Sequence, residues 1–99
     1  MSVNIHLKLR VDTLESLGEA EAVKMALAEV LRKHRLGDEL NLRKFREPIS
    51  VKATTGKWPM IITGFGAWSA EFERDVTAAV RGVAPSAAVD LEWGFPDNP

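Results

Sequence analysis

Hydrophobic and polar residues alternate along the first stretch of the chain, residues 3–11. The apolar positions are Val3, Ile5, Leu7, Leu9 and Val11, and the residues between them are polar or charged. A period of two is typical of a β-strand with one buried face and one wetter face. The pattern therefore predicts an opening strand over residues 3–11.

A helical period follows, from Leu17 to His34. Ser16 with Glu19 three residues later forms a capping box at its start. Gly37 is expected to take the left-handed backbone angles that stop a helix. One face is apolar, because hydrophobic residues recur every three or four positions: Val23, Ala26, Leu27, Val30 and Leu31.

Strand-like alternation returns from Leu40 to Thr55. Phe45 falls out of register with the apolar positions on both sides, and Pro48 has no N–H for a ladder hydrogen bond. The segment is therefore predicted to be one broken or bulged edge strand. Residues 54–57, Thr-Thr-Gly-Lys, have the composition of a hairpin turn.

The most apolar run, residues 58–68, predicts a central strand, since such a run bounded by Gly and Pro is typical of a covered strand. Ser69 is a suitable N-cap for a second helix ending near Gly82. Alternation over residues 88–93 predicts a fourth strand, and residues 94–99 form a short C-terminal tail.

The predicted order is βαββαβ in a single domain, residues 1–99. This order is that of the ferredoxin-like α+β sandwich, in which two helices cover one face of a four-stranded antiparallel sheet. Right-handed crossovers place the first and last strands side by side. Asp90 and Glu92 of the last strand are then expected to face His6, Lys8 and Arg10 of the first.

Composition narrows the functional classes. The chain of 99 residues has no cysteine, which excludes disulfides and thiol chemistry. Its start lacks the pattern of a signal peptide, and no apolar run approaches the ~20 residues of a membrane helix. We therefore expect a cytoplasmic protein with no membrane association.

Catalytic patterns do not emerge from the sequence. His6 and His34 have no partner at metal-ligand spacing, and neither a nucleophile elbow nor a Walker loop occurs. We expect neither enzyme activity nor a bound metal or cofactor. His34 is interpreted as a helix cap and His6 as a partner of Asp90 or Glu92.

The net charge of −1 is unevenly distributed. Residues 1–57 hold 11 Lys and Arg against 8 Asp and Glu, a balance of +3, and residues 58–99 hold 2 against 6, a balance of −4. The most basic stretch is 32–57. Such a stretch suits an acidic partner or nucleic acid, or it is an edge strand that Lys and Arg protect against aggregation.

Gly64-Phe65-Gly66 is the most suggestive short motif. It resembles the centre of the RNP1 motif on the third strand of RRM domains, which would imply RNA binding. It departs from that motif at Thr63, Ala67 and Ala70, where basic and aromatic residues are expected. Two other interpretations are an anion-binding loop and glycines that allow the chain to turn from strand into helix, which we favour.

The leading hypothesis is a small non-catalytic domain that binds another protein, as an immunity-type neutraliser or a regulatory subunit, or that forms a homodimer. Exposed aromatic and basic side chains are the candidate contacts: Trp58, Trp68, Phe95, Arg43, Lys44 and Arg46. One alternative is an RRM-like nucleic-acid-binding module that also uses Lys8, Arg10 and Lys52. Another is a small-anion sensor.

Overall fold

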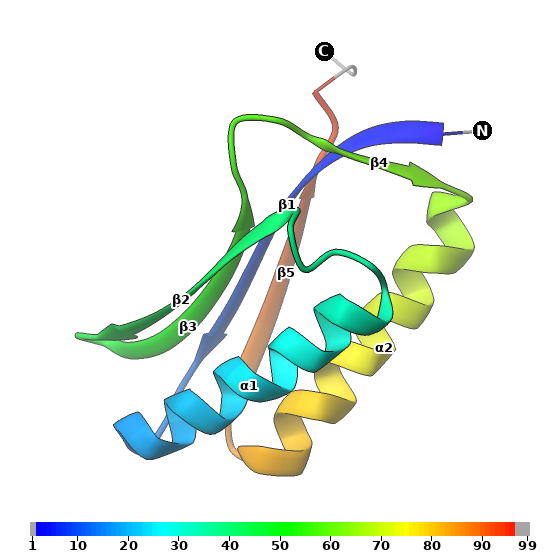
Figure 1. Ribbon diagram of the computed structural model, residues 1–99. Coiled ribbons are helices and arrows are strands. Elements are labelled where there is room, and N and C mark those ends of the chain that lie inside the picture. Colours follow the sequence, from blue (N-terminus) through cyan, green and yellow to red (C-terminus); the bar gives the residue numbers. More distant parts are fainter. Residues whose placement is uncertain (1, 97–99) are drawn as a thin grey trace.

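The computed structural model describes residues 2–96 and shows two layers (Figure 1). Helices α1 and α2 both lie on one face of a five-stranded antiparallel sheet. The α+β class and the antiparallel sheet are therefore confirmed. The elements are β1 (Ser2–Asp12), α1 (Leu17–Lys33), β2 (Leu40–Arg46), β3 (Ile49–Thr55), β4 (Met60–Thr63), α2 (Phe65–Val83) and β5 (Ala88–Gly94).

Strand β1 is the centre of the sheet. Its residues 8–11 pair with both β3 and β5, so these two strands lie on opposite edges of β1. Its first residues, Ser2 to Ile5, pair instead with β4. Strand β2 pairs with β3, so the order across the wide part of the sheet is β2, β3, β1, β5.

The hydrophobic core lies between the sheet and the two helices. The predicted alternation of β1 is confirmed, because Ile5, Leu7, Leu9 and Val11 are completely buried. Full burial of one such side chain contributes about 1.5–3 kcal/mol relative to exposure. The helices cover these residues with apolar faces that repeat at helical spacing: Ala20, Val23, Leu27, Val30 and Leu31 from α1, and Phe72, Val76 and Val80 from α2.

The prediction of a single edge strand over Leu40–Thr55 is wrong. The segment forms two strands, β2 and β3, joined by a tight turn at the cis peptide Glu47–Pro48. The turn suits Pro48, because a residue without N–H costs no ladder hydrogen bond there. Phe45 pairs with Ser50 across the hairpin and is directed away from the core, which explains why it fell out of the apolar register.

The predicted hairpin at residues 54–57 is also wrong. Strands β3 and β4 are both antiparallel to β1, so they run in the same direction and residues 56–59 only connect them. The central partner of β1 is therefore β3, while the apolar run 58–68 supplies only the four residues of β4. The sheet has five strands and not the predicted four.

Helix α2 begins at Phe65, four residues before the predicted cap Ser69. Gly64 is its N-cap and has a left-handed backbone, with φ +66°. Ser69 lies inside the helix, where its Oγ donates to the carbonyl oxygen of Gly66. The chain thus turns from strand into helix at Gly64, and the first turn of α2 contains no acidic residue.

The bounds of α1 agree closely with the prediction, but the residue that ends the helix is not the predicted Gly37. Ser16 Oγ accepts from the backbone N–H of Glu19 at 3.0 Å, and Glu19 Oε1 accepts from the N–H of Glu15 at 3.1 Å. At the other end His34 is the C-cap, and the left-handed residue is Arg35, with φ +60°, instead of Gly37.

The pairing of β5 with β1 confirms most of the predicted charge register. Glu92 lies opposite Lys8, and Asp90 lies opposite Arg10. His6 was expected to meet one of these carboxylates, which is wrong: it lies opposite Gly94 and its Nδ1 is 2.9 Å from Thr55 Oγ1. Gly94 belongs to β5 and not to the tail, of which residues 97–99 lie outside the described residues.

Candidate binding surface

The face of the sheet opposite the helices is uncovered by any described element, and we call it the open face. Side chains alternate along strands, so the register assembles two rows across the sheet. One row is Asn41, Thr54, Lys8 and Glu92; the other is Arg43, Lys52, Arg10 and Asp90. The open face therefore gathers four cations from three adjacent strands and two carboxylates from β5.

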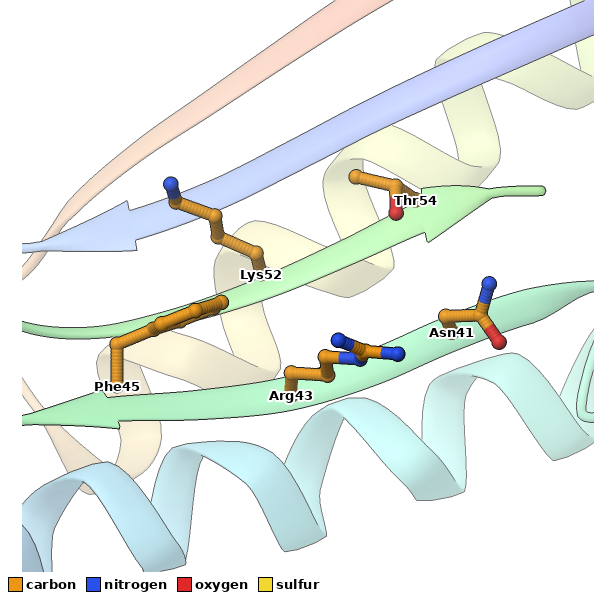
Figure 2. A pocket seen from close by; sticks show the side chains of 5 residues that line it. All are labelled: Asn41, Arg43, Phe45, Lys52 and Thr54. Carbon is orange, nitrogen blue, oxygen red and sulfur yellow. The ribbon is translucent and has the colours of Figure 1, made fainter.

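Two shallow hollows mark this face. The first, of about 320 Å³, lies over β2 and β3, and Figure 2 shows the five side chains that line it: Asn41, Arg43, Phe45, Lys52 and Thr54. The second, of about 290 Å³, extends across β1 to β5. Lys52 and Thr54 line both hollows, so the two hollows belong to one continuous surface.

Phe45 supplies the aromatic component of the open face. Its side chain is 38% exposed, and the Lys52 Nζ lies 5.0 Å from its ring centroid. A cation at that distance is attracted to the ring face. The sequence signal for this arrangement was present, because Phe45 interrupts the apolar register; Asn41 and Thr54 carried no such signal.

The cations of this surface differ in how firmly they are held. Arg10 donates from Nε to Asp12 Oδ1 at 2.9 Å. Lys8, Arg43 and Lys52 make no ion pair within residues 2–96. Because an anion approaching them displaces no internal carboxylate, these three are the residues of the open face best able to bind an acidic group.

The basic residues of β2 do not all lie on the same face of the sheet. Arg43 belongs to the open face, whereas Lys44 and Arg46 alternate to the helix side. Lys44 Nζ lies 2.8 Å from Glu21 Oε2 of α1. This hydrogen bond and the charge of Lys44 lower the pKa of Glu21 below its usual value. The predicted basic contact set is thus divided across both sides of an edge strand.

Among the predicted aromatic contacts, Trp58 is the freely accessible one. It is 76% exposed in the connection before β4, and Lys57 Nζ lies 5.4 Å from its ring centroid. Ile61 of β4 is 71% exposed. Asp38 and Glu39 line the same hollow as Trp58.

Trp68 and Phe95 take part in an internal aromatic cluster. Trp68 stacks on the buried Phe72 with ring centroids 4.9 Å apart, and Phe95 meets Phe65 edge-on at 5.5 Å. Trp93 joins the cluster, and its Nε1 donates to Glu73 Oε1 at 2.8 Å. Trp68 and Phe95 therefore both close the end of the core, while Phe95 keeps 39% of its side chain exposed, about as much as Phe45.

The structure also forms a polar cluster between the helices that was not predicted. His34 Nε2 lies 2.8 Å from Asp75 Oδ2, and Lys33 Nζ lies 2.9 Å from the same oxygen. The His34 side chain is only 7% exposed, and its ring meets those of Trp68 and Phe72. The two sides are 41 residues apart in the chain, so no local pattern indicates this contact.

The hydrogen bonds of this cluster shift the pKa values of Asp75 and Lys33. The hydrogen bond from Lys33 and then that from His34 lower the pKa of Asp75 below its usual value of 3.8. Conversely, Asp75 raises the pKa of Lys33 above 10.5. Lys33 and His34 lie at the end of α1 and Asp75 lies in α2, so these two hydrogen bonds link the helices; the His34 end of the link is buried, whereas the Lys33 side chain is 61% exposed.

The RNP1-like motif is not on a strand. Phe65 begins α2 and packs against Trp68, Trp93 and Phe95. An RNA base therefore has no stacking platform at this position, because RRM aromatics stack bases from the exposed sheet face. The resemblance to RNP1 is therefore contradicted, because these residues were expected on a strand and instead begin a helix.

Residues 2–96 contain no group of three or more His, Asp or Glu side chains placed to hold a metal ion. Neither α1 nor α2 is apolar enough over its length to cross a bilayer. Comparison with family models, with curated proteins and with solved structures finds no match to this chain. The class of protein is thus defined by its own geometry: a two-layer α+β domain with one open, cationic sheet face.

Proposed function

We propose that this protein is a non-catalytic binding module and that its open face binds an acidic surface of another protein. The observation that carries the proposal is the gathering of Lys8, Arg10, Arg43 and Lys52 on a face that neither α1 nor α2 covers. A neutraliser of an enzyme or toxin and a regulatory subunit are both roles of this kind.

The architecture supports the same proposal. We infer that β1, β2, β3 and β5 form a ferredoxin-like arrangement to which β4 is added as a short fifth strand. In this arrangement the strands present one continuous surface while the helices stabilise the other side. A rigid sheet loses little conformational entropy on binding, which favours its use as a recognition surface.

The composition of the open face resembles that of protein interfaces. Arginine and aromatic residues are enriched among residues that dominate binding energy, where one truncation costs about 2 kcal/mol or more. Arg43 and Phe45 lie side by side on β2 and line the same hollow. They are the residues whose substitution is expected to weaken binding most.

The test uses two double variants of equal charge. Arg43→Gln with Lys52→Gln removes two cations from the open face, and Arg32→Gln with Arg81→Gln removes two exposed cations from the helices. Proteins captured by immobilised wild-type chain are identified, and their binding is repeated with purified components. The proposal expects a partner that the first variant loses and the second retains; equal retention of every partner by both variants contradicts it.

Single-stranded nucleic acid is the second candidate, since Phe45 offers one stacking platform beside the four cations. Asp90 and Glu92 on β5 repel phosphates and the carboxylates of an acidic protein alike, so either partner is expected to lie over β1, β2 and β3. Fluorescence anisotropy with a single-stranded RNA at about 50 mM salt decides between the candidates, because phosphate contacts are strong there and weaken steeply as salt rises. Absence of binding under this condition removes the nucleic-acid function.

A further inference from the structure

Strand β2 is an edge of the sheet. Within residues 2–96 it pairs only with β3, and its residues 43–46 are exposed one after another. In Figure 1 the hairpin of β2 and β3 projects past the helices at the left. Because side chains alternate between the two faces of a strand, four exposed residues in a row mean that β2 is accessible on both faces at this end, as well as along its unpaired edge.

The direction of the backbone groups of β2 follows from one hydrogen bond. Leu7 donates its backbone N–H to Thr55 Oγ1 at 3.1 Å, so the main-chain groups of Leu7 point toward β3. In antiparallel pairing these groups alternate between the two sides of each strand. Carried through the register, the alternation directs those of Arg43 toward β3 and those of Lys44 outward.

The outward edge carries positive charge on both faces. Arg43 lies on the open face, and Lys44 and Arg46 lie on the helix side of the same strand. Side chains of a strand laid along this edge would alternate between the same two faces. Lys44 is already paired with Glu21, so acidic residues of the added strand would meet Arg43 on the open face and Arg46 on the helix side.

We propose that β2 is the docking edge for an extended acidic segment of the partner protein, which adds to the sheet as a further strand. In this recognition mode main-chain hydrogen bonds supply affinity and side-chain contacts supply selectivity. The inference rests on the proposed function and specifies it: the partner's segment lies along β2 and its flanking groups reach Arg43 and Phe45 on the open face.

A second copy of this chain suits the edge less well. Symmetric pairing of β2 with β2 places Arg43, Lys44 and Arg46 against the same cations of the other copy, and like charges on paired strands are destabilising. Strand β5 of another copy carries Asp90 and Glu92, but pairing it with β2 is a heterologous contact that leaves both outer edges free. Such pairing would build open chains.

The same cations are also suited to protecting an edge against aggregation, and the experiment separates the two roles. The probe is a fluorescent peptide of about eight residues that alternates glutamate with valine, a typical strand length. A matched peptide has N-methyl groups on every second residue, which removes main-chain donors without changing charge. A third peptide has lysine in place of glutamate.

Binding to the wild-type chain is measured by fluorescence anisotropy. The glutamate peptide is expected to bind, the N-methylated peptide to bind at least about tenfold more weakly, and the lysine peptide not to bind. Backbone amides of Leu42, Lys44 and Arg46 are expected to gain protection from hydrogen exchange in the complex. A protective edge predicts no binding of any peptide, and that result overturns the proposal.

Two variants of Lys44 test the edge from the side of the protein. Lys44→Pro removes one outward N–H, which an edge strand tolerates, whereas Lys44→Val removes the same charge and keeps the N–H. The proline variant is expected to bind the glutamate peptide at least about tenfold more weakly than the valine variant. If thermal unfolding shows that Lys44→Pro does not fold, the N-methylated peptide and the hydrogen exchange measure the same property.

The outcomes distinguish this inference from the proposed function. Equal binding of the two glutamate peptides, lost in Arg43→Gln with Lys52→Gln, overturns edge addition and leaves an acidic partner on the open face. Growth of the protein into larger species with concentration, abolished by Asp90→Asn with Glu92→Gln, assigns the edge to β5 of another copy and also overturns the proposal.

Discussion

Arg35 offers a direct test of how α1 ends. The N–H of Arg35 donates to the carbonyl of Arg32 at 3.0 Å, and the N–H of Leu36 donates to that of Leu31 at 2.7 Å. This pair of bonds is the Schellman motif, which requires a left-handed residue after the C-cap, usually glycine. Here that residue is Arg35, with φ +60°, so we predict that Arg35→Gly stabilises the protein.

The magnitude follows from two opposing contributions. A residue other than glycine costs about 1–2 kcal/mol in the left-handed region, and the greater freedom of glycine in the unfolded chain offsets about 0.4–1 kcal/mol of this gain. Arg35→Gly is therefore expected to raise the free energy of unfolding by about 0.5–1 kcal/mol. In a domain of 99 residues the unfolding midpoint then rises by roughly 2–8 °C.

Urea unfolding followed by tryptophan fluorescence measures this change. Arg35→Ala is the matched control, since it removes the same charge and keeps the strained backbone. Gly37→Ala is the second control: a Cβ there meets nothing within 4 Å and its φ is not left-handed, so the substitution is expected not to destabilise. An Arg35→Gly protein no more stable than Arg35→Ala, or a clear loss of stability in Gly37→Ala, would refute the assignment of the left-handed residue.

Three further predictions concern α2. Gly64→Ala is expected to cost about 1 kcal/mol through backbone strain alone, because a Cβ at this left-handed position has open space; urea unfolding measures it, and an unchanged midpoint contradicts it. Phe72→Ala removes a fully buried ring and is expected to lower the free energy of unfolding by about 3–5 kcal/mol, measured by the same urea unfolding. A loss below about 1 kcal/mol would contradict the tight packing of the aromatic cluster. The charged form of Asp75 favours the folded state because its folded pKa is depressed below 3.8, so its contribution is present above that value and is lost as pH falls through the folded pKa. Asp75→Asn is therefore expected to be less stable than wild type at neutral pH and to lose stability less steeply on acidification, as measured by unfolding at a series of pH values; identical pH profiles would exclude this role.

Local patterns predicted much of the architecture. Alternation over residues 3–11 identified β1 and its buried face, and the capping box at Ser16 identified the start of α1. Charges on β5 were expected opposite those of β1, and Glu92 does lie opposite Lys8. These features depend on neighbours within a few residues, or on two strands whose pairing the chain order already restricts.

The partner of β1 was not predictable in the same way. An apolar run shows that a segment is buried, but burial does not state which strand it pairs with. Residues 58–68 appeared the better central strand, yet β3 occupies that position because the turn at Glu47–Pro48 folds the chain back earlier. Once β3 is paired with β1, the apolar run is left with a short strand and the start of α2.

The candidate surface shows the same division. The many cations of residues 32–57, and the alternation that keeps Lys8 and Arg10 out of the core, can be read from the amino-acid order alone. That Arg43 and Lys52 lie beside Lys8 and Arg10, while Lys44 pairs with Glu21, follows from the folded arrangement of the strands. The physical reason is that a period of two assigns each side chain to a face, whereas the composition of that face depends on the pairing of strands distant in the chain.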